Sequence, residues 1–132
     1  MTDYTNYEVG RFGETYCAKY IKKNKRLKVI GRNVTIGKLE MDIIATNSTH
    51  IVFVEVKTRR KDKNNFFRPA DAVNRDKRAN LINFAYTYCK SLPKKHLGKI
   101  PRIDVCELLV LVDKKLKVCE INYIENAVTK DK

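Results

Sequence analysis

Hydrophobic positions along the chain recur with two different periods, and these periods predict the order of the secondary-structure elements. Apolar and aromatic residues recur at helical spacing over residues 6–24, a segment that opens with a capping-box sequence. A second helical stripe starts at Asp71 or Asn74 and runs to about Leu92. Runs typical of strands lie between and after these helices, at residues 27–34, 38–46, 50–57, 103–112 and 116–121. The predicted order is αβββαββ.

Two of the predicted strands should form an antiparallel hairpin, because only the polar turn 47–49 separates residues 38–46 from residues 50–57. Paired residue numbers in this hairpin sum to about 96, which places Asp42 opposite Glu55 or one residue away. A mixed five-stranded sheet flanked by helices, an α/β fold, accommodates the predicted order.

The remaining segments are predicted to be loops within one domain. The charged segment 58–69 and the segment 93–102 interrupt the strand and helix patterns. A chain of 132 residues fits a single hydrophobic core. We therefore expect one domain over residues 1–132, with a short polar tail from about residue 129.

The charge of the chain indicates nucleic acid as its partner. The sequence has 28 Lys and Arg residues against 15 Asp and Glu residues, a formal net charge of +13, which attracts phosphate polyanions. A membrane surface ranks second, because both predicted helices have apolar faces suited to a core. No apolar run approaches the roughly 20 residues of a membrane span, and the N-terminus lacks an apolar signal region. The four cysteines show no metal-ligand spacing, so we expect reduced core thiols in a cytoplasmic protein without a membrane partner.

The segment 51–57 carries the candidate chemistry. Its apolar residues occupy both faces, as in a central strand, yet Glu55 and Lys57 stand at its end and project from one face. Carboxylates as close as those of Asp42 and Glu55 repel each other unless a divalent cation that prefers oxygen ligands binds between them. Lys57 could then orient a water molecule or stabilise charge on a phosphate. The plainer alternative is a solvated strand edge or a simple ion pair.

Two helical residues are further candidates. Lys77 interrupts the apolar stripe near the start of the second helix, where its charge opposes the helix dipole, so an anion such as a phosphate is expected nearby. The alternative is a lysine stem that lies over the core with its ammonium group in water. Glu14, on the flank of the first helix, could reach an adjoining sheet edge, although most helical glutamates are only solvated.

Basic residues directly follow the candidate strand. Arg59, Arg60 and Lys61 are expected to hold backbone phosphates. Phe66 and Phe67 could stack on a base, and a hydrophobic plug that anchors a long loop explains them equally well. A second basic loop contains Lys94, Lys95, Lys99 and Arg102.

The acidic residues and the Glu-Val-Lys sequence resemble the active-site pattern of the PD-(D/E)xK nuclease superfamily. Within it, the chain is similar to the YraN-like family of predicted endonucleases. The matching motifs span most of the chain in that family's order: Gly10-Arg11-Phe12-Gly13-Glu14, Arg32-Asn33, Glu40-Met41-Asp42-Ile43-Ile44-Ala45, Val52-Phe53-Val54-Glu55-Val56-Lys57-Thr58-Arg59, Lys77 and Arg102-Ile103-Asp104. That family usually has Gly-Glu-Ile-Asp where this chain has Leu39-Glu40-Met41-Asp42, with its glycine at Gly37, which predicts an altered local turn.

The resemblance implies a restriction-endonuclease-like core, akin to archaeal Holliday junction resolvases, with Mg²⁺ or Mn²⁺ as cofactor. It implies that Asp42 and Glu55 are metal ligands, that Lys57 is the catalytic lysine, and that Glu14 is an auxiliary acidic ligand. The expected function is metal-dependent hydrolysis of DNA, with branched or junction DNA as a substrate that a homodimer would suit. The first alternative is a nucleic-acid-binding module that keeps the fold without turnover, and a weaker one is a protein-interaction adaptor whose metal site is structural.

Overall fold

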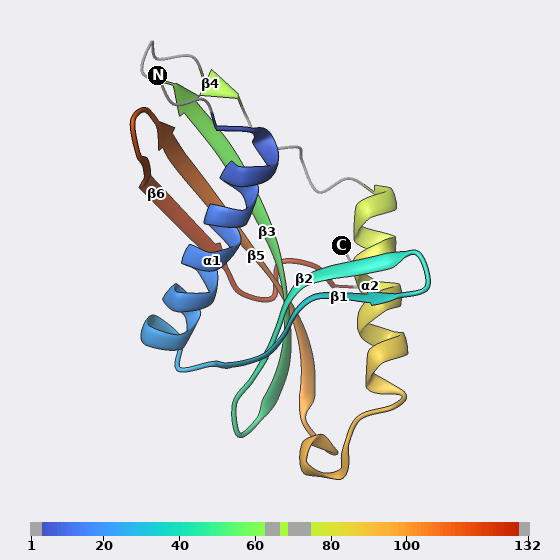
Figure 1. Ribbon diagram of the computed structural model, residues 1–132. Coiled ribbons are helices and arrows are strands. Elements are labelled where there is room, and N and C mark those ends of the chain that lie inside the picture. The colour runs from blue at the N-terminus through green and yellow to red at the C-terminus, as the bar shows by residue number, and fades with distance from the viewer. Residues whose placement is uncertain (1–3, 63–66, 69–74, 130–132) are drawn as a thin grey trace.

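The structure, a computed structural model, describes residues 4–62, 67–68 and 75–129. A central sheet has the strand order β1-β2-β3-β5-β6, and the short strand β4 pairs with β3 (Figure 1). The elements are α1 (Asn6–Asn24), β1 (Lys28–Ile36), β2 (Leu39–Thr46), β3 (His50–Asp62), β4 (Phe67–Arg68), α2 (Arg75–Cys89), the 3₁₀ helix η1 (Lys94–His96), β5 (Ile100–Val112) and β6 (Leu116–Ile124). The predicted order αβββαββ and the mixed five-stranded α/β sheet are confirmed, with β4 as a small addition.

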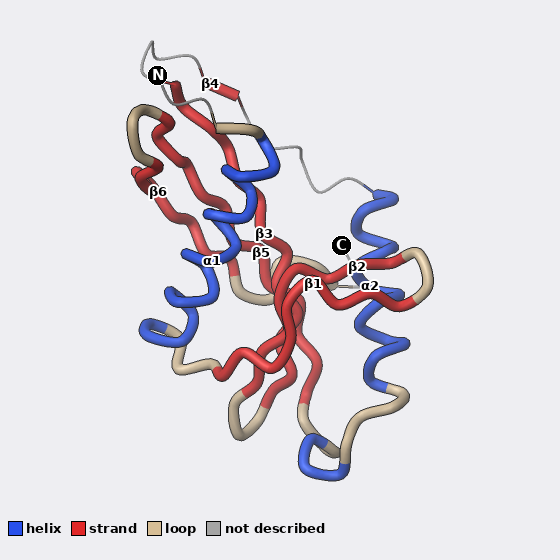
Figure 2. The backbone as a smooth tube through the Cα atoms, viewed as in Figure 1, coloured by secondary structure: helices blue, strands red, loops and turns tan. Residues whose placement is uncertain are grey.

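The sheet is mixed because β3 and β5 pair in parallel, whereas all other neighbours pair antiparallel. In Figure 2 these two long strands run side by side through the middle of the molecule. The predicted hairpin of β2 and β3 is confirmed, since Ile43 pairs with Val54, within one residue of the expected register. Asp42 and Glu55 are the next two positions along these strands.

Each helix covers one face of the sheet and forms its own hydrophobic core. Val52 and Val54 of β3 lie in the core under α1, whereas Ile51 and Phe53 lie in the core under α2. Because strand side chains alternate, even-numbered residues of β3 face α1 and odd-numbered residues face α2. No helix among the described residues combines the length and the apolar character needed to cross a membrane.

The element ends differ from the prediction mainly at residues 58–62, a charged segment that belongs to a strand. Residues 58–62, predicted as a loop, extend β3 because they pair in parallel with residues 108–112 of β5. A parallel partner supplied by a distant apolar run overrides the local polar composition. At the other ends, β5 begins at Ile100, β6 continues to Ile124 and α2 ends at Cys89. The predicted start of α2 at Asp71 or Asn74 lies outside the described residues.

Gly37, which stands two residues earlier than the glycine of the resembled family, lies in the turn between β1 and β2. Gly37 has a φ of 60°, a left-handed conformation that suits glycine in a two-residue hairpin turn. Leu39 then pairs with Ile36 as the first residue of β2. The turn is thus formed before Leu39, and Leu39 begins the strand that carries Asp42.

Helix α1 approaches β3 closely at Gly13. A Cβ atom at this buried position would collide with Thr58 Oγ1 and would lie 3.2 Å from Leu108 Cδ1. Gly10, on the same helix, has no atom within 4 Å of the corresponding position. Only the second glycine of this motif is therefore required by packing.

Gly13→Ala is expected to lower the free energy of unfolding by about 1–3 kcal/mol, because the added methyl group must displace the Thr58 side chain or move the helix away from β3. Gly10→Ala is the matched control and is expected to raise that free energy by up to about 1 kcal/mol, the helix-propensity difference. Urea unfolding of both variants measures the two values. Equal effects of the same sign would contradict the close approach.

Candidate active site

Asp42 and Glu55 meet on the face of the sheet that α2 covers. Glu55 is only 3 % exposed, and Asp42 lies across the hairpin from it. The backbone N–H of Val56 donates a hydrogen bond of 2.8 Å to Asp42 Oδ2, which fixes that carboxyl group against β3. The predicted proximity of the two acidic residues is therefore present.

The two carboxyl groups do not both ionise easily. Burial contributes most to raising the pKa of Asp42. Its hydrogen bond with Glu55 and the charge of Glu55 follow, and Glu14 adds a smaller contribution. The hydrogen bond from the Val56 N–H lowers the pKa of Asp42, but the other contributions outweigh it and raise this pKa to about 8. Asp42 thus retains a proton at neutral pH in the metal-free protein.

This raised pKa predicts a pH-dependent stability. Between the ordinary Asp pKa of 3.8 and the folded value of about 8, the folded chain binds a proton that the unfolded chain releases. The free energy of unfolding therefore falls as pH rises through this window. In EDTA, Asp42→Asn is expected to gain stability relative to wild type between pH 5 and pH 8, by on the order of 2 kcal/mol.

Thermal unfolding of wild type and Asp42→Asn across this pH range measures the difference. Asp113→Asn, at an exposed turn, is the control and should follow wild type at every pH. A stability difference between wild type and Asp42→Asn that does not change with pH would mean that Asp42 ionises normally.

Two lysines direct their ammonium groups at the same oxygen of Glu55. Nζ of Lys77 lies 2.8 Å from Glu55 Oε2, and Nζ of Lys57 lies 3.9 Å from it. This buried oxygen accepts no well-formed hydrogen bond from the described residues and is held by charge. Burial lowers the pKa of Lys77, but Glu55, then Asp42 and Glu40, outweigh burial and raise it. An anion thus lies beside Lys77, and it is the Glu55 carboxylate.

Glu14 stands next to this group, on the side of β1. With the Asn33 amide oriented to satisfy its neighbours, Asn33 donates to Glu14 Oε1 at 3.2 Å and accepts from Arg11 at 3.3 Å. Glu14 also lines a depression of about 450 Å³ together with Asn33 and Glu40. The charge of Glu14 also contributes to the raised pKa of Asp42. The predicted reach of Glu14 to a sheet edge is therefore present.

The donor set suits a hard divalent cation at the pair of carboxyl groups. Burial and the neighbouring Glu55 raise the pKa of Asp42, and a bound cation would offset both effects, while Glu55 offers a buried oxygen that the Lys77 and Lys57 ammonium groups face. Mg²⁺ and Mn²⁺ prefer carboxylate oxygens and commonly take only one or two from the protein, with water and substrate as the other ligands. Across residues 4–62, 67–68 and 75–129, no three acidic, His or Cys side chains are grouped closely enough to hold a metal ion. Glu14 is thus beside the pair and not grouped with it.

The extended strand β3 arranges the basic residues by face. Lys57, Arg59 and Lys61 follow Glu55 at alternate positions and therefore share its face. Arg60 faces α1, where its guanidinium donates to Tyr4 O at 3.2 Å and to the Asn6 side chain at 2.9 Å. The structure therefore separates Arg60 from the other basic residues predicted to bind nucleic acid. Phe66 lies outside the described residues, and only the backbone of Phe67 is described.

Glu107 of β5 is a polar neighbour of the site that the sequence pattern did not reveal. It pairs with Lys57 in the parallel register, so both side chains leave the same face. Its Oε1 accepts a hydrogen bond of 3.0 Å from Asn122 of β6. In the sequence, Glu107 stands out only as the single acidic residue of the apolar run 105–112. Its relation to the site follows only from the pairing of β5 with β3.

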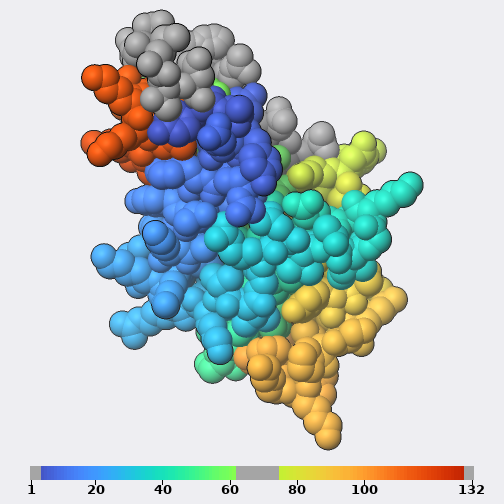
Figure 3. Space-filling model, in the orientation of Figure 1, coloured from blue at the N-terminus to red at the C-terminus, as the bar shows by residue number. Residues whose placement is uncertain are grey.

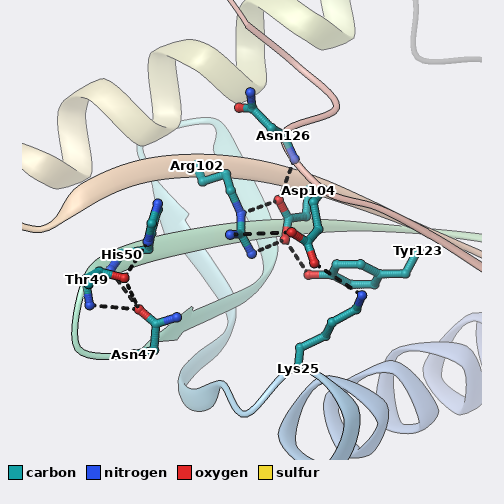
Figure 4. A network of polar contacts seen from close by, with 9 residues as sticks. Lys25, Asn47, Thr49, His50, Arg102, Asp104, Tyr123 and Asn126 are labelled. Carbon is teal, nitrogen blue, oxygen red and sulfur yellow. Dashed lines mark hydrogen bonds and ion pairs between the residues drawn. The ribbon is translucent and has the colours of Figure 1, made fainter.

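The Arg102 and Asp104 motif forms a separate network on the α1 face of the sheet (Figure 4). Asp104 is fully buried and accepts two hydrogen bonds from the Arg102 guanidinium, at 2.9 and 3.0 Å. It also accepts from the Tyr123 hydroxyl at 2.6 Å and from the Asn126 N–H at 2.9 Å. Burial, and then Asp104, raise the pKa of Tyr123. These contacts join β5, β6 and the C-terminal segment, so this motif supports the fold.

Comparison with known proteins adds a family to this geometry. The model of the uncharacterised protein family UPF0102 matches residues 13–108, a range that includes Glu14, Asp42, Glu55, Lys57 and Lys77. A UPF0102 protein of Syntrophomonas wolfei is 39% identical over 123 residues, covering 92% of this chain and 98% of the relative. One from Caldanaerobacter subterraneus is 37% identical and covers 90% of this chain and 93% of the relative.

Proposed function

Because this chain belongs to the uncharacterised protein family UPF0102, whose name assigns no activity, we propose its function from the site itself. We infer a metal-dependent endonuclease that hydrolyses phosphodiester bonds in DNA. The observation that carries the proposal is the position of Asp42 across the hairpin from the buried Glu55, with Lys57 on the same face as Glu55. The resemblance of these residues to the PD-(D/E)xK nucleases, and to the YraN-like endonucleases among them, supports the same chemistry.

Hydrolysis requires an attacking water molecule and a means of stabilising the negative charge that develops on the phosphate. A Mg²⁺ or Mn²⁺ ion held by Asp42 and Glu55 would supply Lewis acidity and neutralise part of that charge. Lys57, whose side chain is 16 % exposed, would donate hydrogen bonds to the attacking water or to a phosphate oxygen. The water oxygen forms the new bond to phosphorus and releases a proton to solvent, while the bond to the leaving sugar oxygen breaks and the sugar oxygen takes up a proton from solvent.

The face that carries the site also supplies the charge for binding. Lys57, Arg59 and Lys61 form a line of cations along β3, which leads away from Glu55. Lys77 is half-buried and near Glu55, so its ammonium is placed to approach a phosphate once a metal ion balances that carboxylate. We propose that this face binds the DNA backbone, with branched or junction DNA as the preferred substrate and a homodimer as the form that would engage its two strands.

The test is a cleavage assay with purified protein on single-stranded, duplex, flap and four-way-junction DNA. Cleavage is expected in Mn²⁺ or Mg²⁺ and is expected to stop in EDTA. The pattern of products identifies the preferred structure. DNA binding without cleavage of any substrate in either metal would contradict the nuclease.

A second candidate function is a nucleic-acid-binding module without turnover. Two observations favour it: the described residues contain no group of three metal ligands, and Lys77 already balances the charge of Glu55. Such a module would bind the same DNA substrates with affinity unaffected by EDTA. The cleavage assay, run together with a binding assay, separates the two functions.

A further inference from the structure

A strongly basic groove lies at the turn between β2 and β3, away from the candidate active site in the middle of these strands. Its volume is about 650 Å³. Three segments wall it: the connection between α1 and β1, the hairpin turn between β2 and β3, and the residues around η1. In Figure 3 these segments meet toward the lower edge of the face shown. Its positively charged or titratable lining residues are Lys25, Arg26, Lys28, Lys95, His96 and Lys99, and no acidic residue lines it among those that the structure describes.

Most of this positive charge is not balanced locally. Lys25 pairs with Glu125 at 3.2 Å, but Arg26, Lys28 and Lys95 make no ion pair within the part of the chain that the structure describes. All three of these side chains are exposed. Like charges gathered in one hollow repel each other, and a bound polyanion removes that repulsion.

The walls of the groove are already ordered by hydrogen bonds. Asn47 Oδ1 accepts from the N–H groups of Thr49 and His50, at 2.9 and 2.8 Å, which holds the hairpin turn in one conformation (Figure 4). Lys99 Nζ donates to Thr46 Oγ1 at 3.0 Å and lies 3.1 Å from His96 Nδ1. An ammonium group is therefore fixed in the groove, beside the hydroxyl and amide groups of the turn. Preorganised donors of this kind suit phosphate oxygens.

We propose that this groove binds a second segment of the sugar-phosphate backbone of the nucleic acid, an inference that rests on the proposed function. Thr46, in the groove, is four residues along β2 from Asp42, a separation of about 13 Å at roughly 3.3 Å per residue. Successive phosphates of a strand advance only about 3.4 Å along a duplex axis. A phosphate in the groove therefore lies about four phosphates along the strand from the one at the active site, or on the neighbouring strand.

The test compares two double variants that remove equal charge. Lys28→Gln with Lys95→Gln alters the groove, and Lys114→Gln with Lys115→Gln alters the exposed turn between β5 and β6. The logarithm of the DNA-binding constant falls linearly with the logarithm of the salt concentration. The groove variant is expected to make this slope shallower by about 1.8 for duplex or junction DNA, or about 0.9 per lost phosphate contact. The control is expected to keep the wild-type slope. The control should also keep the wild-type cleavage rate at saturating DNA, since Lys114 and Lys115 touch neither the groove nor the active site.

Equal slopes for the two double variants would overturn the groove proposal. A further measurement is binding to vesicles of phosphatidylglycerol and phosphatidylcholine, because Leu97 and Ile100 are exposed beside the groove at 64% and 58%. Loss of vesicle binding in the groove variant, with DNA binding unchanged, would also overturn the proposal and would assign the groove to an anionic bilayer.

The two proposals can fail separately. If wild type cleaves no DNA but the slopes of the two double variants differ, the groove binds nucleic acid and the nuclease proposal fails. If wild type cleaves DNA and the slopes are equal, the nuclease proposal stands and the groove proposal fails.

Discussion

Lys57→Met is expected to lower the single-turnover rate of metal-dependent DNA cleavage by about 10²–10³-fold, the loss seen when one preorganised donor is removed. The methionine keeps most of the volume of the side chain but has no ammonium group to donate to water or to the phosphate. Nζ of Lys57 lies 3.9 Å from Glu55 Oε2, and the variant retains both carboxyl groups. DNA affinity should fall only slightly, because one of several cations on this face is lost.

Lys61→Met is the matched control for this prediction. It removes the same charge from the same strand and the same face, four residues beyond Lys57 in the direction away from Glu55. Its cleavage rate at saturating DNA should equal that of wild type. If both variants lose rate equally, Lys57 contributes only to binding and its assignment to the chemistry is wrong.

Asp104→Asn is expected to lower the free energy of unfolding by about 3–5 kcal/mol, the cost of removing one partner of a buried ion pair. Asp104 is 0 % exposed, and the change leaves the largely buried guanidinium of Arg102 without its carboxylate. The asparagine amide also replaces an oxygen that accepts from Tyr123 or from the Asn126 N–H. Urea unfolding measures the loss, and cleavage per folded molecule should be retained.

Glu107→Gln is the control on the same strand, because it alters one half-buried acid with a single hydrogen bond to Asn122. Glu107→Gln should lower the free energy of unfolding by less than about 1 kcal/mol. The double variant Arg102→Met with Asp104→Asn should lose less than the sum of the single changes, since no unpaired guanidinium remains. A loss below about 1 kcal/mol in Asp104→Asn would show that the network does not support the fold.

Periodicity predicted the parts of the fold that local sequence determines. Helix α1 has the predicted bounds, and Thr5 and Glu8 form the capping box, with hydrogen bonds of 2.9 and 3.0 Å. The short turn fixed the hairpin register closely enough to bring Asp42 to Glu55. The four cysteines are free thiols, and Cys17 and Cys106 lie in the core as predicted, but Cys119 is exposed, so the prediction of core thiols is wrong for that residue. The helix and the hairpin both depend on contacts close in sequence.

The remaining features depend on contacts between distant segments. Residues 58–62 contain no apolar pattern and become strand only because β5 lies beside them. The same pairing sends Arg59 and Arg60 to opposite faces, which a loop prediction could not distinguish. Of the second basic loop predicted from the sequence, Lys95 and Lys99 line the groove beside the α1–β1 connection and the hairpin turn. Arg102 instead belongs to β5 and pairs with Asp104, so its assignment to that loop is wrong.

The most direct test of the metal-dependent nuclease compares wild type with Glu55→Gln, purified in parallel, for cleavage of DNA in Mn²⁺ and in EDTA. We expect wild type to cleave in Mn²⁺ only. We expect Glu55→Gln to bind DNA at least as tightly as wild type without cleaving it, because the change removes a metal ligand and a negative charge. Equal cleavage by both proteins, or binding without cleavage by both, would contradict the proposed nuclease.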